Sequence, residues 1–172
     1  MRIVVFPRVR IPVLTKNANA VLKEIEKKAA VRLSLEEDSV RIEALSEEKN
    51  GSLEWIAEQV LKAISYGFKP QHAFKLFRED YFLEEMDLAL MLHGSKKAIE
   101  RYKGRIIGSE GKAKKIIEEL SGSWISISGD RIALVGRYDE LMDAKEAVTR
   151  LIEGSQHASV YEFLERKKKL RE

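Results

Sequence analysis

Alternating apolar and polar residues in two stretches of the chain predict a β-hairpin in each. In residues 31–45 the alternation is interrupted by Glu37-Asp38-Ser39, which has the composition of a turn. Residues 123–136 repeat the pattern, with Gly129-Asp130 at the turn. Because successive side chains of a strand point to opposite faces, a period of two indicates strands that bury one face.

Apolar residues spaced three or four apart predict a helix after each hairpin. The first helix is expected in residues 51–68, with Ser52 as its N-cap and Gly67 as its stop. The second is expected in residues 137–154, which end at a glycine. The apolar stripes of the two helices consist of Leu53, Ile56, Val60 and Ile64, and of Leu141, Ala144, Val148, Leu151 and Ile152.

The same order of elements recurs at an offset of about 92 residues, which indicates an internal duplication. Leu33 and Leu35 of the first hairpin match Ile125 and Ile127 of the second. A strand is also expected at the start of each half, in "RIVVFP" and in "EEMDLALMLHG", where Met86, Leu88, Leu90 and Leu92 alternate.

Each half therefore has the predicted order β-α-α-β-β-α, in which helices back a three-stranded sheet, and the fold class is α+β. We expect a first domain in residues 1–67, a helical linker in residues 68–79, and a second domain in residues 80–172 that includes a C-terminal helix.

Composition excludes several classes of protein. The chain has no cysteine, so neither a disulfide framework nor a cysteine-bound zinc is expected. No apolar run approaches the roughly 18 residues of a membrane span, and the N-terminus does not resemble a signal peptide, so a cytoplasmic protein without membrane contact is expected. The three histidines are scattered, and neither a metal nor a cofactor is predicted.

Positive charge is concentrated in two basic islands on a more acidic background. Residues 1–32 hold eight basic residues against two acidic ones, and residues 96–115 hold the same numbers. Such islands favour a polyanionic partner, although a charge cluster is often only a solvated face. The basic end of the last helix, residues 166–169, either extends such a surface or is a solvated tail.

The second island contains "KGRIIGSEGKAKKIIEEL", in which Gly108 and Gly111 lie three apart before a lysine-rich helix. Glycine adopts positive φ without penalty and lets a backbone approach closely. The N–H groups at the start of the following helix, at the positive end of its dipole, attract phosphate. Lysines oppose that dipole, so their presence at this helix start favours a bound polyanion.

This stretch resembles the KH module, whose G-x-x-G loop between two helices grips about four nucleotides of single-stranded nucleic acid. The element order is similar to that of type I KH domains, so the resemblance implies two tandem type I KH domains. The residues expected to contact RNA are Arg101, Lys103, Arg105, Ile107, Gly108, Ser109, Glu110, Gly111, Lys112, Lys114, Lys115 and Ile125. Among them, Glu110 is assigned only a place in the loop, because a carboxylate repels phosphate.

The first half resembles a KH entrance that has lost its glycines, because Lys16-Asn17-Ala18-Asn19 stands where the G-x-x-G loop is expected. RNA binding by this half is therefore in doubt, and a structural or protein-contact role is expected. The whole chain is similar to the archaeal counterpart of a eukaryotic pre-ribosomal KH factor, the partner of the Nob endonuclease. That resemblance implies binding near the 3′ end of small-subunit ribosomal RNA, a role in its maturation, and contact with the Nob endonuclease.

Two other functions remain as alternatives. An RNA-processing nuclease would need catalytic residues, and the nearest approach to a carboxylate cluster is Glu84, Glu85 and Asp87, which we interpret as the solvated side of a strand. A protein-protein scaffold with a KH fold is disfavoured by the glycine pair for the second half and stays open for the first. A non-catalytic RNA-binding protein is therefore the leading hypothesis.

Overall fold

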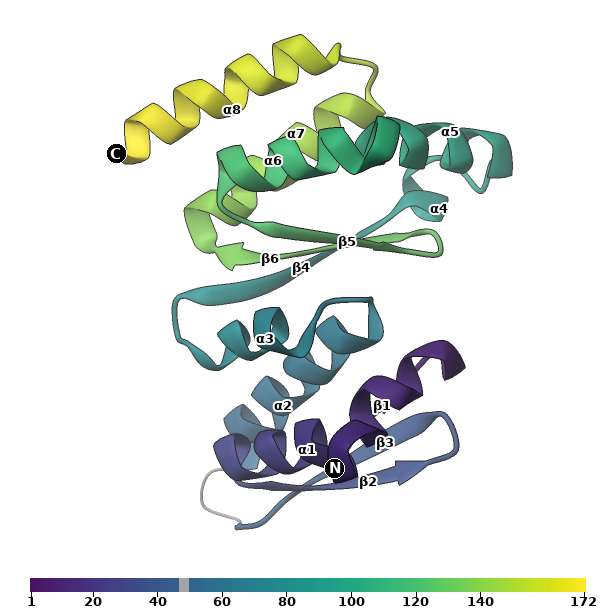
Figure 1. The fold of residues 1–172 in the computed structure, drawn as a ribbon, viewed down its shortest axis with the longest axis vertical. Helices are drawn as coiled ribbons and strands as arrows, with labels where there is room; N and C mark the ends of the chain where they lie inside the picture. Colours follow the sequence, from purple (N-terminus) through teal and green to yellow (C-terminus); the bar gives the residue numbers. More distant parts are fainter. Residues whose placement is uncertain (47–49) are drawn as a thin grey trace. The chain divides into compact units, whose positions relative to one another are not determined.

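The structure is a computed structural model that describes residues 1–46 and 50–172. The chain divides into two compact units, Met1–Glu79 and Asp80–Glu172. Both units are α+β, and each contains one antiparallel three-stranded sheet. The strand order is β1-β3-β2 in the first unit and β4-β6-β5 in the second, so the third strand of each half lies in the middle of its sheet (Figure 1).

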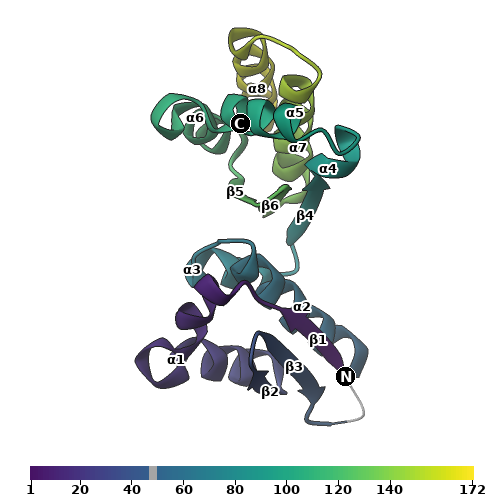
Figure 2. The same ribbon diagram turned by 90° about the vertical axis from the view of Figure 1, so that its right-hand side faces the viewer.

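The first unit begins with an edge strand and two helical segments. Its elements, in order, are β1 (Arg2–Val5), η1 (Arg8–Arg10), α1 (Ile11–Ala29), β2 (Val31–Glu36), β3 (Ser39–Ala44), α2 (Asn50–Ser65), α3 (Pro70–Ala73) and η3 (Phe74–Phe77). The predicted hairpin is confirmed as β2 and β3, which pair with Leu33 opposite Ile42. Helix α1 lies alongside β2 (Figure 2).

Two details of the first unit differ from the sequence prediction. Helix α2 begins at Asn50, so Ser52 lies inside the helix and is not its N-cap. Residues 68–79, predicted as a helical linker, contain α3 and η3 and belong to the first unit. They do so because Phe68, Ala73 and Leu76 are buried, and their burial attaches the segment to α2.

The second unit packs its helices on one sheet. Its elements are β4 (Tyr81–Asp87), α4 (Leu88–Met91), α5 (Lys96–Ile107), η4 (Ser109–Gly111), α6 (Lys112–Ser121), β5 (Trp124–Ser128), β6 (Arg131–Arg137), α7 (Tyr138–Ile152) and α8 (His157–Arg171). The central strand β6 is buried from Ile132 to Gly136. Helices α6 and α7 lie between the sheet and α8 (Figure 1).

The predicted strand at the start of the second half is too long. Alternation from Met86 to Leu92 suggested one strand, but β4 ends at Asp87 and α4 follows. The Asp87 carboxylate causes the change, because it accepts a hydrogen bond from the backbone N–H of Leu90 at 3.2 Å and caps the new helix. Leu88 is then fully buried, whereas Leu90 is 78% exposed.

Within the described residues, no helix combines the length and the apolar character needed to cross a bilayer.

The core of the second unit joins all three of its layers. It contains residues of the sheet (Met86, Ile125, Ile132 and Leu134), of the helices that cover it (Ile106, Ile117, Leu141 and Val148) and of α8 (Val160, Phe163 and Leu164).

Candidate nucleic-acid interface

The G-x-x-G loop lies between α5 and α6, where its two glycines have different steric surroundings. Gly108 has φ +76°, and a Cβ atom built on it would lie 2.6 Å from the Cβ of Ala113 and 2.7 Å from its backbone nitrogen. Gly111 has φ +74°, and a Cβ atom there would meet nothing within 4 Å. Gly108 therefore lets the loop pack against α6, and Gly111 leaves an open approach to the backbone.

The start of α6 is free to receive an anion. Its N-cap is Gly111, which has no side chain and so provides no capping hydrogen bond. The first N–H groups of any helix lack partners within the helix, and the helix dipole adds positive potential there. Ser109 and Glu110, the two middle residues of the loop, are exposed, and Glu110 adopts a left-handed φ of +56°. The loop thus presents backbone to solvent.

The predicted cationic side chains surround this loop with different degrees of freedom. Lys112 and Lys115 are exposed, and neither forms an ion pair with a residue that the structure describes. Lys114 pairs with Glu118 at 3.3 Å, one helical turn along α6. Lys112 and Lys115 are therefore the cations of α6 most available to a phosphate.

Two further cations lie on α5, before the loop. The Lys103 amino group is 3.6 Å from a carboxylate oxygen of Glu100. The guanidinium of Arg101 lies over the ring of Tyr102, 4.9 Å from its centroid. The Lys103 side chain is 20% exposed, whereas Glu100 and Arg101 are exposed. Single surface contacts of this kind contribute little to stability, so Arg101 and Lys103 can exchange these partners for a phosphate.

The structure corrects the prediction for Arg105. Its guanidinium donates hydrogen bonds to the backbone carbonyl oxygens of Leu151 and, at 2.6 Å, Ser155. Leu151 lies in the last turn of α7 and Ser155 follows three residues after the end of this helix, where the negative end of the helix dipole favours positive charge. This geometry gives Arg105 a structural role in place of a phosphate contact, because its charge faces α7.

The two isoleucines among the predicted RNA contacts, Ile107 and Ile125, have different surroundings in the structure. Ile107 is half-buried and is the last residue of α5, directly before Gly108. Ile125 is 2% exposed and belongs to the core, so its side chain is not placed to make the predicted RNA contact. The period-two pattern predicts that Ile125 lies on the buried face of its strand, but it does not tell whether the protein core or a ligand covers that face.

His157 is a residue of this region that sequence reasoning missed. Its Nε2 lies 2.8 Å from the carbonyl oxygen of Arg105, the third-last residue of α5. Because a carbonyl can only accept, Nε2 carries the proton in this contact. No local signal marks His157, since its partner is 52 residues away.

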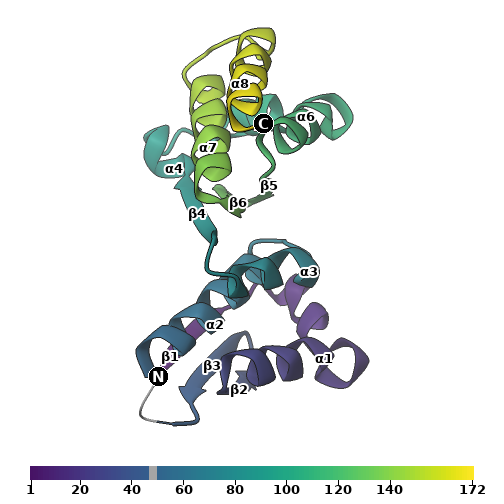
Figure 3. The same ribbon diagram turned by 90° about the vertical axis from the view of Figure 1, so that its left-hand side faces the viewer.

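The corresponding loop of the first unit has part of the same backbone shape without glycine. Helix α1 is broken at Lys16–Asn19 (Figure 3), where Asn17, Ala18 and Asn19 have φ of 54°, 55° and 62°. At Gly111, the counterpart of Asn19, the space beyond Cα is empty. A side chain at that position projects into the space that a phosphate would use.

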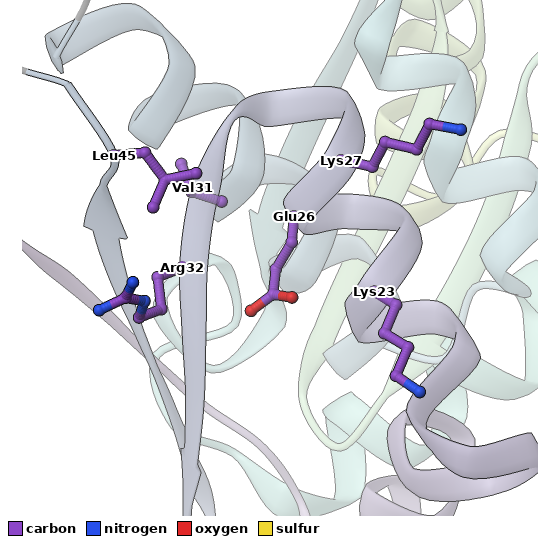
Figure 4. Close-up of a pocket in the computed structure, with 6 residues that line it drawn as sticks. All are labelled: Lys23, Glu26, Lys27, Val31, Arg32 and Leu45. Atoms are coloured by element: carbon purple, nitrogen blue, oxygen red, sulfur yellow. The ribbon is translucent and has the colours of Figure 1, made fainter.

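A hollow of about 400 Å³ also lies on the first unit, between α1 and β2 (Figure 4). Its lining residues are Lys23, Glu26, Lys27, Val31, Arg32 and Leu45. Figure 4 shows the Glu26 carboxylate between the helix and the strand, while the ends of Lys23 and Arg32 point in opposite directions. The three cations do not converge, so the hollow does not form a single phosphate site.

Other side chains that could mark a functional site have ordinary partners. Glu84 pairs with Lys145 at 2.6 Å and Glu85 with Arg131 at 3.2 Å, so these carboxylates do not gather in one place. Trp124 stacks on Tyr81, with ring centroids 6.4 Å apart, which is strand packing. In residues 1–46 and 50–172, no group of three or more histidine, aspartate or glutamate side chains is arranged to hold a metal ion.

Comparison with known proteins agrees with this geometry. A family profile for the second KH domain of PNO1, described as a eukaryotic type KH-domain (KH-domain type I), matches residues 82–169. The chain belongs to the PNO1 family of KH-domain proteins. The match contains the loop, the helices beside it and all three strands of the second unit, so this unit has the KH-type fold that the sequence suggested.

Individual relatives extend the similarity to almost the whole chain. A KH domain-containing protein of Methanocaldococcus jannaschii is 38% identical over 169 residues, which are 98% of this chain and 74% of that protein. The RNA-binding protein pno-1 of Caenorhabditis briggsae is 29% identical over 164 residues, which are 93% of this chain but only 59% of that protein. The chain thus spans less than two thirds of this nematode PNO1 protein.

A solved structure of an archaeal relative matches both units. A chain in the crystal structure of the a/eIF2alpha-aDim2p-rRNA complex from Pyrococcus horikoshii is 36% identical and has a TM-score of 0.87. The match covers 98% of the present chain and 93% of that chain.

Proposed function

We propose that this protein binds single-stranded RNA near the 3′ end of small-subunit ribosomal RNA and assists the maturation of that RNA without cutting it. The observation that carries the proposal is the loop from Gly108 to Gly111, whose open backbone precedes an uncapped helix start. Relatives support it, since one is named an RNA-binding protein and another occurs in a complex with rRNA.

The loop would hold RNA mainly through its phosphates. A phosphate beside Gly111 meets the free N–H groups of α6, and Lys112 and Lys115 add charge at its sides. Lys103 and Arg101 continue the positive surface along α5, and Ile107 offers an apolar contact next to the loop. The bases must be unstacked to lie in such a groove, so the ligand is single-stranded.

The first unit would be an altered KH domain that holds a protein partner. Its sheet has the same strand order as that of the second unit, and its broken helix has left-handed residues where the loop is expected. The side chain at Asn19 obstructs the approach that its counterpart Gly111 leaves open. The partner suggested by the family resemblance is the Nob-type endonuclease, which would do the cutting.

The test compares three RNAs by fluorescence anisotropy. They are the 3′-terminal segment of the organism's small-subunit RNA, a scrambled oligonucleotide of equal length, and a duplex of the terminal segment. We expect the tightest binding to the single-stranded terminal segment and a loss of affinity with rising salt, because phosphate contacts release counterions. Equal affinity for the terminal and scrambled strands, with and without the endonuclease, would refute the ribosomal assignment.

A second assay separates binding from catalysis. The purified protein is incubated with the same RNA in magnesium or manganese, and the products are resolved on a denaturing gel. Intact RNA is the expected result, and specific cleavage that disappears in a binding-deficient variant would establish the nuclease alternative instead.

A further inference from the structure

Helix α8 contacts the ends of both helices that flank the G-x-x-G loop. At its first residue, His157 Nε2 donates to the Arg105 carbonyl in the last turn of α5. At its last residue, Arg171 Nη2 donates to the carbonyl oxygens of Leu120 at 3.0 Å and Ser121 at 3.3 Å, at the end of α6. One helix therefore supplies hydrogen-bond donors to the C-terminal ends of both neighbours.

These contacts satisfy groups that a helix cannot satisfy by itself. The last four carbonyls of a helix have no partner within it, and a positive side chain there also interacts favourably with the negative end of the helix dipole. Helix α5 has to end before the loop, because Gly108 leaves the helical region at φ +76°. The Gly108 N–H bonds to the Gly104 carbonyl, and His157 takes the next carbonyl along.

Apolar packing along α8 and an ion pair at its last residue also hold the helix in place. Val160, Phe163 and Leu164 are buried in the core of the second unit. Arg171 also pairs with Asp143 of α7, and Tyr161 packs near His157 with ring centroids 6.0 Å apart. The helix is thus fixed along its length, which allows its ends to hold α5 and α6 in place.

We propose that α8 holds the G-x-x-G loop in its binding shape, with His157 and Arg171 as positioning residues that never touch RNA. This inference rests on the proposed RNA binding by the loop and names what keeps the loop preorganised. The phosphate contact needs the end of α5 and the start of α6 at a fixed separation. His157 fixes the end of α5, and Arg171 fixes α6 from its far end.

Substitutions at His157 separate positioning from direct contact. His157→Ala removes the donor, and His157→Gln keeps an N–H donor in a side chain of similar reach. We expect His157→Ala to weaken RNA binding about three- to tenfold, the equivalent of one hydrogen bond, and His157→Gln to recover most of it. Arg171→Gln should weaken binding in the same direction.

The salt dependence of binding provides the readout that distinguishes the two roles. A positioning residue does not neutralise a phosphate, so the slope of log Kd against log salt should stay at its wild-type value in His157→Ala and Arg171→Gln. The control is Lys168→Gln, an exposed cation on the same helix, which should leave hydrogen exchange of the loop unchanged. In His157→Ala, amides of residues 104–113 should exchange faster while those of β6 do not.

Each outcome decides between the possibilities. If wild type fails to bind RNA, the proposed function fails and so does this inference. If wild type binds, and His157→Ala and Arg171→Gln bind with unchanged affinity, only the inference about α8 fails. A lowered salt slope in Arg171→Gln would overturn the positioning role, because it would place Arg171 on the RNA.

Discussion

The side-chain carboxylate of Glu118 accepts a hydrogen bond from the backbone N–H of Ile125 at 3.0 Å. In the first unit, Glu26 accepts the N–H of Leu33 at 2.8 Å. Glu118 lies 92 positions after Glu26, and Ile125 lies 92 positions after Leu33, which is the offset of the internal repeat. The bond joins the helix after the loop to the edge strand that follows it, so the two units share a specific contact as well as an element order.

This contact predicts a stability difference that can be measured at one position. Glu118→Ala leaves the partly buried N–H of Ile125 without its acceptor, and the free energy of unfolding should fall by about 1–2 kcal/mol. Glu118→Gln keeps an acceptor oxygen and should lose less. Urea unfolding followed by circular dichroism measures both, with exposed Glu119→Ala as the control. Equal losses in the alanine and glutamine variants would show that the hydrogen bond is not responsible.

The two loops should respond unequally to negative charge. Replacing both Ser109 and Glu110 with aspartate puts a second carboxylate beside the phosphate path without new backbone geometry, so RNA binding should fall strongly while the fold persists. The same pair of changes at Asn17 and Ala18 should have little effect, because side chains obstruct that loop. Anisotropy with one oligonucleotide compares the variants. A similar loss from both pairs would mean that the first unit also binds RNA.

Substitutions at Gly108 and Gly111 should have different effects on stability and on RNA binding. Gly108→Ala strains φ and also forces Ala113 to move, so we expect it to destabilise the protein by clearly more than about 1–2 kcal/mol, the left-handed penalty alone. Gly111→Asn should be milder, because asparagine tolerates this conformation and the space is open. It should nevertheless weaken RNA binding, since its side chain occupies the approach. Thermal unfolding and anisotropy, performed on both variants, test the two statements.

Substitution of Arg105 should lower the stability of the protein, whereas substitution of Lys112 should change the salt dependence of RNA binding. Arg105→Gln removes charged hydrogen bonds to the Leu151 and Ser155 carbonyls, and should lower stability by about 1–3 kcal/mol. The salt slope of RNA binding should not change, because this guanidinium faces α7. Lys112→Gln should barely alter stability and should lower the slope by about 0.7, the value for one phosphate of a single strand. A reduced slope in Arg105→Gln would restore its role as a phosphate contact.

Much of the architecture follows from local pattern. The alternation around Leu33 and Ile125 specifies both hairpins, because strand side chains have a period of two. The glycine spacing at Gly108 and Gly111 marks the loop, since few other residues adopt its backbone angles. These features depend on neighbours in the sequence, and for that reason the element order and the loop could be predicted.

Other features depend on partners that are distant along the chain, and only the tertiary structure decided them. The charge of Arg105 suggested a phosphate contact, but carbonyls 46 and 50 residues away take up its guanidinium. The contacts of α8 are distant in the same way. His157 bonds to the carbonyl of Arg105 in α5, 52 residues away, and Arg171 bonds to the carbonyl of Leu120 in α6, 51 residues away. The sequence by itself determined which residues form the loop, whereas packing of α7 and α8 decided which nearby cations remain free for a ligand.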